Sequence, residues 1–389
     1  MKTMKVLFIL LIAAFTAKSQ EAMVTNNDKD MVSKTFNTVR NHHFHPLNDE
    51  NSMTQDRNLN VAGIADLNDE DWKVRLLAVR DLVRAGSHST DEIITGLMDQ
   101  SADVRQVSAM ALGILGAKQA VDELEKIVRN DDNAMVRSQA VIALGQIESG
   151  KSLDLLRLRL KEDPSRDVRH QCELAIDQIE KQMGTTEKQL SAFLSLDEST
   201  FETIQVGSKA PNFKLDDTES REWQLSEFNN KKWVVLIWVF ADWCPVCHGE
   251  FHDLMKMQQE FKEANVQVFT VEMHDLYRGR VMVGKELEPE YWFAKESFKE
   301  AYTNQIWWPH LLDRAGSVGA MFGADPLTFS VHAEYINRPT TVIIDPNGVV
   351  RFIYPGTFWG DRPTIEQTLD MIKTGDFSFK HPKRLSVER

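Results

Sequence analysis

An internal repeat between residues 58 and 184 limits the possible folds of this chain more than any other sequence feature. Four copies open on a Val-Arg pair, with the arginines at Arg75, Arg105, Arg137 and Arg169, so successive copies are 30, 32 and 32 residues apart. Each copy starts with an apolar helical pattern, and second helices are predicted over residues 91–98, 120–128 and 153–160. Because a helix pair cannot bury its apolar face alone, we expect neighbouring pairs to stack.

The first helix of each copy runs into a cluster of aliphatic residues and glycine, over residues 109–113 in the second copy and 140–145 in the third. This sequence pattern, which runs from Val-Arg to Ala-Leu-Gly, resembles the short HEAT-like repeats of α-solenoids, of the phycobilisome-lyase type. The resemblance implies a protein-binding or structural role. We expect Gly113, Gly116 and Gly145 to end the first helices. The recurring arginines are expected to pack their stems between repeats and to pair with neighbouring aspartates.

The N-terminal segment has the pattern of an export signal. Lys2 and Lys5 give it a positive start, residues 6–15 are apolar, and small residues precede a cleavage site predicted after Ser19. An uncleaved anchor helix is the alternative interpretation. The sequence therefore predicts a signal peptide over residues 1–19 and a periplasmic or secreted protein, with no stable membrane span after cleavage.

Residues 20–57 are polar and show no sustained periodicity, which predicts a flexible linker. The linker contains His42, His43 and His45. A metal site could use such histidines, but no acidic or thiol partner completes a ligand set nearby, so we interpret them as a solvated cluster and predict no metal.

From residue 206 onward, strand and helix patterns alternate. Residues 232–240 form a continuous apolar run rich in β-branched side chains, as in a strand covered on both faces. The other predicted elements are helices over 245–264, 288–302, 317–322 and 362–373 and strands over 266–273, 310–313, 340–344 and 349–354, the last two joined by a turn at 345–348. The chain is therefore predicted to be multidomain: the repeats, a linker over 185–205, an α/β domain with a mixed sheet over 206–377, and a tail over 378–389.

The chain has three cysteines, Cys172, Cys244 and Cys247. A disulfide between Cys244 and Cys247 would close almost no loop and add little stability, so this cysteine pair favours a redox or ligand-binding role. It stands where a buried strand meets a helix, and free N–H groups at a helix start stabilise a thiolate. We therefore expect a lowered pKa for Cys244, with Cys247 one turn further on closing the disulfide. Cys172 lies in an apolar helical pattern and is interpreted as a small buried side chain.

The surroundings of the cysteine pair carry a second resemblance. Residues 206–213 resemble the opening of the redoxin domains of the thioredoxin superfamily, of the AhpC/TSA and TlpA-like type. Residues 237–247 look like their active-site strand and motif, residues 309–313 and 322–323 match their middle, and residues 338–348 match the segment with the cis-proline. The resemblance runs from about residue 206 to 375, with its landmarks in order, and implies a thioredoxin-like fold.

The resemblance implies roles for individual residues. Cys244 would attack and Cys247 would resolve, forming the Cys244–Cys247 disulfide, and Pro339 would be a cis-proline that faces the pair. Glu250 matches an acidic residue behind the thiols and could relay protons, or it could simply stabilise the helix start.

Three residues are expected to line the substrate site: Trp243, Pro245 and Arg338. Trp243 would shield one side of it, or pack as a core aromatic, and Pro245 lies between the cysteines, where it influences their potential. Aromatic-rich insertions over residues 274–306 and 325–337 suggest either a binding wall or additional core.

Two positions bear on peroxidase chemistry. Peroxiredoxins carry Thr or Ser three residues before the reactive cysteine, and Ala241 stands there relative to Cys244. Arg338 does match the peroxiredoxin arginine, and its guanidinium could lower the thiol pKa, although a salt bridge at the strand start is equally plausible. Reductase or isomerase activity therefore leads, with thiol peroxidase activity second.

The sequence motif Cys-x-x-Cys-His, from Cys244 to His248, is also the attachment signature of c-type haem. The preceding strand, Trp243 and the Arg338–Pro339 segment fit a redoxin better, so no cofactor is predicted.

The functional hypotheses differ in class. The formal charge of −13 argues against nucleic acid, so no nucleic-acid partner is predicted. The leading hypothesis is an exported thiol–disulfide oxidoreductase that acts on protein thiols or disulfides, with HEAT-like repeats that dock a protein partner. The alternatives are a thiol peroxidase with peroxide as substrate and a non-enzymatic protein-binding scaffold.

Overall fold

The computed structural model describes residue 69 and residues 71–86, 90–287, 306–332, 334–356 and 361–379. The predicted signal peptide, the linker with its histidines and the predicted helix over 288–302 lie outside the described residues, as does the tail from residue 380 on. The described residues all fall in one compact unit, so the repeats and the α/β domain belong to the same body. No helix in the described ranges is both long and apolar enough to cross a bilayer.

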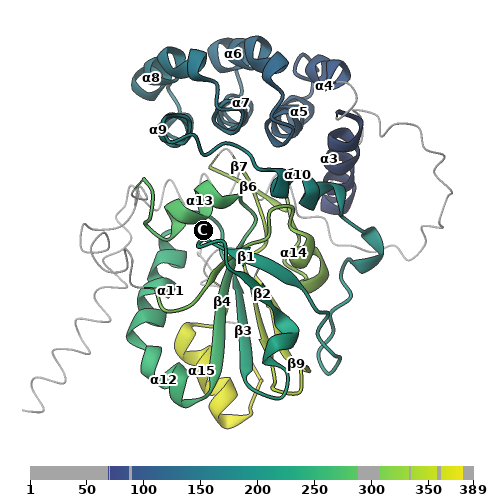
Figure 1. Cartoon of the computed structure of the whole chain (residues 1–389), viewed down its shortest axis with the longest axis vertical. Helices are drawn as coiled ribbons and strands as arrows, with labels where there is room; N and C mark the ends of the chain where they lie inside the picture. The colour runs from purple at the N-terminus through teal and green to yellow at the C-terminus, as the bar shows by residue number, and fades with distance from the viewer. Residues whose placement is uncertain are drawn as a thin grey trace, which may run out of the picture. The chain divides into compact units, whose positions relative to one another are not determined.

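The repeats fold as helix pairs, as predicted. Helices α4, α6 and α8 form one row and α5, α7 and α9 a second row beside it (Figure 1). The rows pack through buried aliphatic residues such as Leu112, Val141 and Leu156. The helices are α3 (Trp72–Gly86), α4 (Asp91–Gly96), α5 (Ala102–Ile114), α6 (Val121–Asn130), α7 (Ala134–Gln146), α8 (Leu153–Glu162) and α9 (Arg166–Glu180).

The recurring arginines link one repeat to the next. Arg105 donates to both carboxylate oxygens of Asp131, at 2.7 and 3.0 Å, and Arg137 does the same to Asp163, at 3.0 and 2.8 Å. The predicted pairing with aspartates is confirmed for these two copies. The first copy differs, because Arg75 donates to the carbonyl of Leu327 in the α/β domain.

The repeat glycines do not all end helices. Gly116 does follow the end of α5 with a φ of +59°, but Gly113 lies inside α5 and Gly145 inside α7. A Cβ on Gly113 would come 3.0 Å from the Cα of Ala143, and one on Gly145 would come 3.1 Å from the Cα of Ala175. The prediction that these two glycines end helices is therefore wrong: they let α5, α7 and α9 approach closely.

The second half of the chain forms a seven-stranded mixed sheet in the order β2-β1-β5-β4-β3-β8-β9. Strand β3 is parallel to β4 and antiparallel to β8, and β4 is parallel to β5. The strands are β1 (Lys214–Asp217), β2 (Glu222–Gln224), β3 (Trp233–Trp238), β4 (Val266–Glu272), β5 (His310–Leu312), β8 (Thr340–Ile344) and β9 (Val350–Pro355). The predicted mixed sheet and its five apolar strands are confirmed.

Helices cover both faces of this sheet and build two apolar cores (Figure 1). One core places Phe251 and Leu369 against Val235, and the other places Phe322 against Trp238 and Phe269. The helices are α11 (Pro245–Lys256), α12 (Gln258–Glu263), α13 (Leu276–Met282), α14 (Ser317–Phe322) and α15 (Ile365–Thr374). The single helix predicted over 245–264 is thus two helices, divided at Met257.

Two elements join the repeats to the sheet domain. Helix α10 (Glu187–Leu194) lies in the segment expected as a linker, and its Phe193 is buried in the core of the repeats. The insertion over 325–337 contains a two-stranded hairpin, β6 (Phe329–Val331) and β7 (Glu334–Ile336). Met273, Ala315 and Leu327 of the sheet domain belong to the same core as the repeat helices, so the two halves share buried apolar surface.

Candidate active site

The cysteine pair lies where β3 gives way to α11. Cys244 is the N-cap of α11 and Pro245 its first residue, a position where the missing N–H of proline costs nothing. The Cys244 Sγ accepts from the backbone N–H of Cys247 at 3.5 Å, and the two sulfurs are 2.9 Å apart. The strand–helix placement predicted from the sequence is therefore observed.

All three cysteines are free thiols in this structure, so the predicted Cys244–Cys247 disulfide is not formed here and remains a prediction for the oxidised protein. Both sulfurs of the pair are fully buried. Cys172 is also fully buried, in α9, and burial raises its pKa to about 12. The interpretation of Cys172 as a small core residue is confirmed.

Arg362, which sequence reasoning missed, supplies the positive charge at the pair. Its Nη2 lies 3.7 Å from the Cys247 Sγ. The same guanidinium donates to both carboxylate oxygens of Glu250, through Nε at 2.7 Å and through Nη2, and to the carbonyl of Trp238. Arg362 and Glu250 thus form a buried ion pair directly behind the second cysteine.

The two thiols have opposite pKa shifts. Burial and the neighbouring Cys247 sulfur raise the pKa of Cys244 well above its ordinary value. Burial also acts to raise the pKa of Cys247, but the hydrogen bond with Cys244 and the guanidinium of Arg362 outweigh it, so the net shift is downward. The lowered pKa predicted for Cys244 is wrong for this arrangement, because the nearest cation faces Cys247 and the pair carries one charge more easily than two.

Two predicted site residues, Glu250 and Trp243, lie around the pair. Glu250 is bound to Arg362, and burial raises the pKa of its carboxyl although the guanidinium opposes the shift. Trp243 is buried, stacks edge-on against His332 with ring centroids 4.6 Å apart, and donates its indole N–H to Glu334.

Arg338 and Pro339 do not take the expected places. Arg338 pairs with Asp325 at 2.7 Å and donates to the carbonyl of Gly356, so the salt-bridge interpretation holds and Arg362 takes the place beside the thiols. Among the described residues every peptide bond is trans, which contradicts the cis bond predicted at Pro339. Pro339 is buried just before β8, and its carbonyl accepts from the Gly356 N–H.

A buried polar network, which no local sequence pattern predicts, adjoins the loop before Cys244. The Asp242 carboxylate binds Arg278 at 2.5 Å and His170 at 3.0 Å, and Arg278 also binds Glu334. These charges hold the pKa of Asp242 far below its ordinary value despite its complete burial. His248 is buried with its Nε2 at the Asp242 carbonyl, so its imidazole is used by the fold, an arrangement that does not fit attachment of haem.

A thioredoxin-like sheet with two thiols at the start of its first covering helix defines a redoxin-type domain. Residues 206–353 match the AhpC/TSA family, and residues 64–139 and 90–177 match HEAT repeats. Residues 206–353 are therefore a redoxin domain of the AhpC/TSA type, and HEAT repeats precede it.

Curated relatives agree with this assignment. The thiol-disulfide oxidoreductase ResA of Geobacillus thermodenitrificans is 29% identical over 170 residues, which cover 44% of this chain and 79% of that protein. ResA of Bacillus subtilis is 28% identical over 177 residues, covering 46% and 81%. A putative peroxiredoxin of Entamoeba histolytica is 27% identical over 187 residues, covering 47% and 72%. The redoxin domain is thus homologous to thiol–disulfide oxidoreductases and to peroxiredoxins.

Proposed function

We propose that this protein is a thiol–disulfide oxidoreductase that uses Cys244 and Cys247 as its dithiol. The observation that carries the proposal is the 2.9 Å separation of two reduced sulfurs at the start of α11, with the Arg362 guanidinium at the second one. A pair this close can form an internal disulfide with little movement. A neighbouring cation lowers the cost of the thiolate that starts the exchange.

The exchange takes two steps. The Cys244 thiolate attacks one sulfur of a substrate disulfide, forms a mixed disulfide and releases the other sulfur as a thiolate, which takes up a proton. The Cys247 thiolate then attacks Cys244, closes the internal disulfide and releases the second substrate thiol. The substrate gains two electrons and the pair loses two, and an external dithiol returns them. Run in reverse, the same steps oxidise a substrate dithiol.

Arg362 and Glu250 have distinct parts in this scheme. In the resting pair the first negative charge stays beside Arg362, on Cys247, and the proton of Cys244 can cross the 2.9 Å between the two sulfurs to Cys247 as Cys244 attacks. In the second step Arg362 stabilises Cys247 as it becomes the attacking thiolate. Glu250 holds the guanidinium in place, so we assign it a positioning role.

Three single variants test the proposal. Cys244→Ser and Cys247→Ser should each abolish reduction of insulin or glutathione disulfide. Cys172→Ser is the matched control, because Cys172 is buried in the repeats and has a raised pKa, and it should leave the activity unchanged. Undiminished reduction by Cys244→Ser would overturn the proposal.

Trapping in the native host identifies the substrate and tests the order of attack. Cys247→Ser should accumulate mixed disulfides between Cys244 and substrate proteins, because no resolving thiol remains. Cys244→Ser, run in parallel, should capture few. If Cys244→Ser captures the substrates instead, the order of attack is the reverse of the one proposed.

Homology to a putative peroxiredoxin makes thiol peroxidase activity the second candidate. One thiolate would attack the peroxide, lose two electrons and become a sulfenic acid while an alcohol or water leaves. The second thiol would then condense with it to form the disulfide and water. Rapid peroxide consumption that one cysteine variant abolishes, with slow insulin reduction by the wild type, would favour this candidate.

Export and docking are separate parts of the proposal. We infer from Lys2, Lys5 and the apolar run over 6–15 that the protein is exported, and the N-terminal sequence of the protein from an envelope fraction should then begin at Gln20. We also propose that the HEAT repeats dock a protein partner. A redox-inert cysteine pair together with a tight partner on the repeats would favour the non-enzymatic scaffold instead.

A further inference from the structure

One face of α9, a helix of the repeats, lies directly against the redoxin domain. Asp167, His170, Gln171 and Leu174 follow the i, i+3, i+4, i+7 spacing that places residues on the same side of a helix. Each contacts the redoxin domain, and the partners in the same order are His332, Asp242, Arg278 and Tyr277. The repeats therefore reach the redoxin domain beside its active-site loop.

The contact between His170 and Asp242 is the most buried of these. The His170 Nε2 lies 3.0 Å from the Asp242 Oδ2, and both side chains are only 2% exposed. Asp242 stands two residues before Cys244, in the loop that joins β3 to α11. A repeat residue thus binds a carboxylate in the loop that carries the first cysteine.

Asp242 is held from three directions. Besides His170, Arg278 of α13 binds the other carboxylate oxygen at 2.5 Å, and His248 of α11 contacts the Asp242 carbonyl. The same loop donates the Phe240 backbone N–H to the Cys247 Sγ at 3.4 Å. The position of Asp242 therefore affects a hydrogen bond that stabilises the reduced form of the pair.

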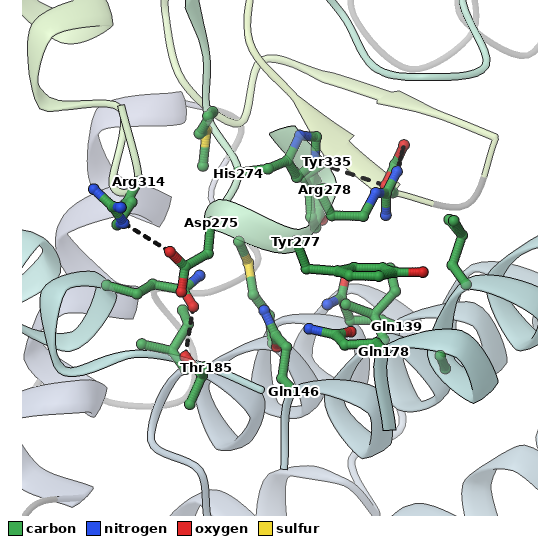
Figure 2. Close-up of a pocket in the computed structure, with 18 of the residues that line it drawn as sticks. Gln139, Gln146, Gln178, Thr185, His274, Asp275, Tyr277, Arg278, Arg314 and Tyr335 are labelled. Atoms are coloured by element: carbon green, nitrogen blue, oxygen red, sulfur yellow. Dashed lines mark hydrogen bonds and ion pairs between the residues drawn. The ribbon is translucent and has the colours of Figure 1, made fainter. Parts of the chain in front are cut away.

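A second route connects α9 with the site. The Asp167 Oδ1 lies 3.2 Å from the His332 Nδ1, and the His332 ring packs edge-on against Trp243, the residue before Cys244. Next to these contacts, the repeats and the redoxin domain enclose a cavity of about 70 Å³, in which Tyr277 projects toward Gln139 and Gln178 of the repeats (Figure 2). The boundary therefore carries polar contacts beside the buried apolar residues that the two halves share.

Buried ion pairs of this kind add little net stability, because the cost of removing charges from water offsets their attraction, and one documented use is to fix a single geometry. We propose that the HEAT repeats act in cis on the redox site, with His170 as a positioning residue that holds Asp242 and the Cys244 loop in place. This inference rests on the proposed dithiol function.

The test measures the redox potential of the cysteine pair in the full chain. The protein is equilibrated with glutathione buffers and alkylated, and its free thiols are counted by mass spectrometry. His170→Ala should make the pair more reducing, because a looser loop weakens the Phe240 hydrogen bond that stabilises the reduced form. We expect the equilibrium constant to shift by about tenfold, which is about 30 mV for a two-electron couple. His170→Gln keeps an N–H donor at similar reach and should restore the wild-type value.

Lys181→Gln is the matched control. Lys181 follows the last residue of α9 and binds Glu286 of the redoxin domain at 2.8 Å, away from the cysteine loop, so its loss weakens the same boundary without moving Asp242. If His170→Ala is unfolded at the assay temperature, His170→Met, which fills the space without a donor, takes its place.

The outcomes separate the inference from the function on which it rests. A wild-type pair that never forms a disulfide in these buffers overturns the dithiol function itself. A wild-type pair with a measurable potential that His170→Ala or His170→Met leaves unchanged, or that Lys181→Gln shifts equally, overturns the positioning role alone.

Discussion

Removal of the Arg362 guanidinium should raise the pKa of Cys247. The Nη2 lies 3.7 Å from the sulfur, and the Arg362 side chain is 1% exposed. At an effective dielectric constant of about 20, two unit charges at that distance attract by about 4.5 kcal/mol. Arg362→Met removes this attraction and should therefore move the first thiol titration to higher pH, as followed by the ultraviolet absorbance of the thiolate.

Two companion variants make this result interpretable. Arg362→Met alone leaves Glu250 buried without its cation, which costs about 3–5 kcal/mol of folding free energy. Arg362→Met with Glu250→Gln removes both charges, so it should recover much of that stability in thermal unfolding and show a smaller shift of the titration. Arg338→Met is the control, because Arg338 pairs with Asp325 and should leave the titration unchanged. A folded Arg362→Met protein with the wild-type midpoint would refute the reasoning.

Three further predictions concern stability, each read from thermal or denaturant unfolding. Gly145→Ala should cost about 1–3 kcal/mol because the new Cβ meets backbone of the next helix, whereas Gly150→Ala, with nothing within 4 Å of its Cβ, should be near neutral. Arg137→Ala should cost about 3–5 kcal/mol because it leaves the Asp163 carboxylate buried and unpaired. Burial lowers the pKa of His248 from 6.5 to about 4, so between these pH values the folded protein binds fewer protons at His248 than the unfolded chain does. The free energy of unfolding should therefore fall by about 3 kcal/mol as the pH drops from 6.5 to 4. His248→Gln should remove that share of the pH dependence, and an unchanged profile would show that His248 is not its source.

Local pattern was enough to predict most of the fold. The helices of the repeats follow from apolar spacing within each copy, and the apolar runs of β3, β4 and β8 mark the centre of the sheet. Edge elements carried no such signal: Lys214–Asp217 has two acidic residues in four, and it becomes β1 only because β2 and β5 pair with it. Helix α13 has seven residues, too few for a periodic pattern to show.

The site was predictable only as far as its residues are close in sequence. The cysteine pair and the start of α11 follow from the local motif, but Arg362 is 115 residues beyond Cys247 and follows no motif of its own. The one available signal was Glu250, because a carboxylate buried near a helix start needs a cation as its partner. Arg338 was chosen for that place by resemblance, and Asp325, within an insertion, binds it instead.

The complete burial of both sulfurs places a further requirement on the proposed chemistry. A disulfide substrate must bring one of its sulfurs into contact with Cys244, which has no exposed surface in this structure, so groups that cover the pair must move during each exchange. Trp243 and the β6–β7 hairpin lie among those groups, and His332 links them to Asp167 of α9. The repeats hold the loop that joins β3 to α11, and this loop must move during each exchange. A partner bound to the repeats and a substrate bound at the thiols would therefore act on the same contacts. If the partner changes the affinity for the substrate, the substrate must change the affinity for the partner by the same factor.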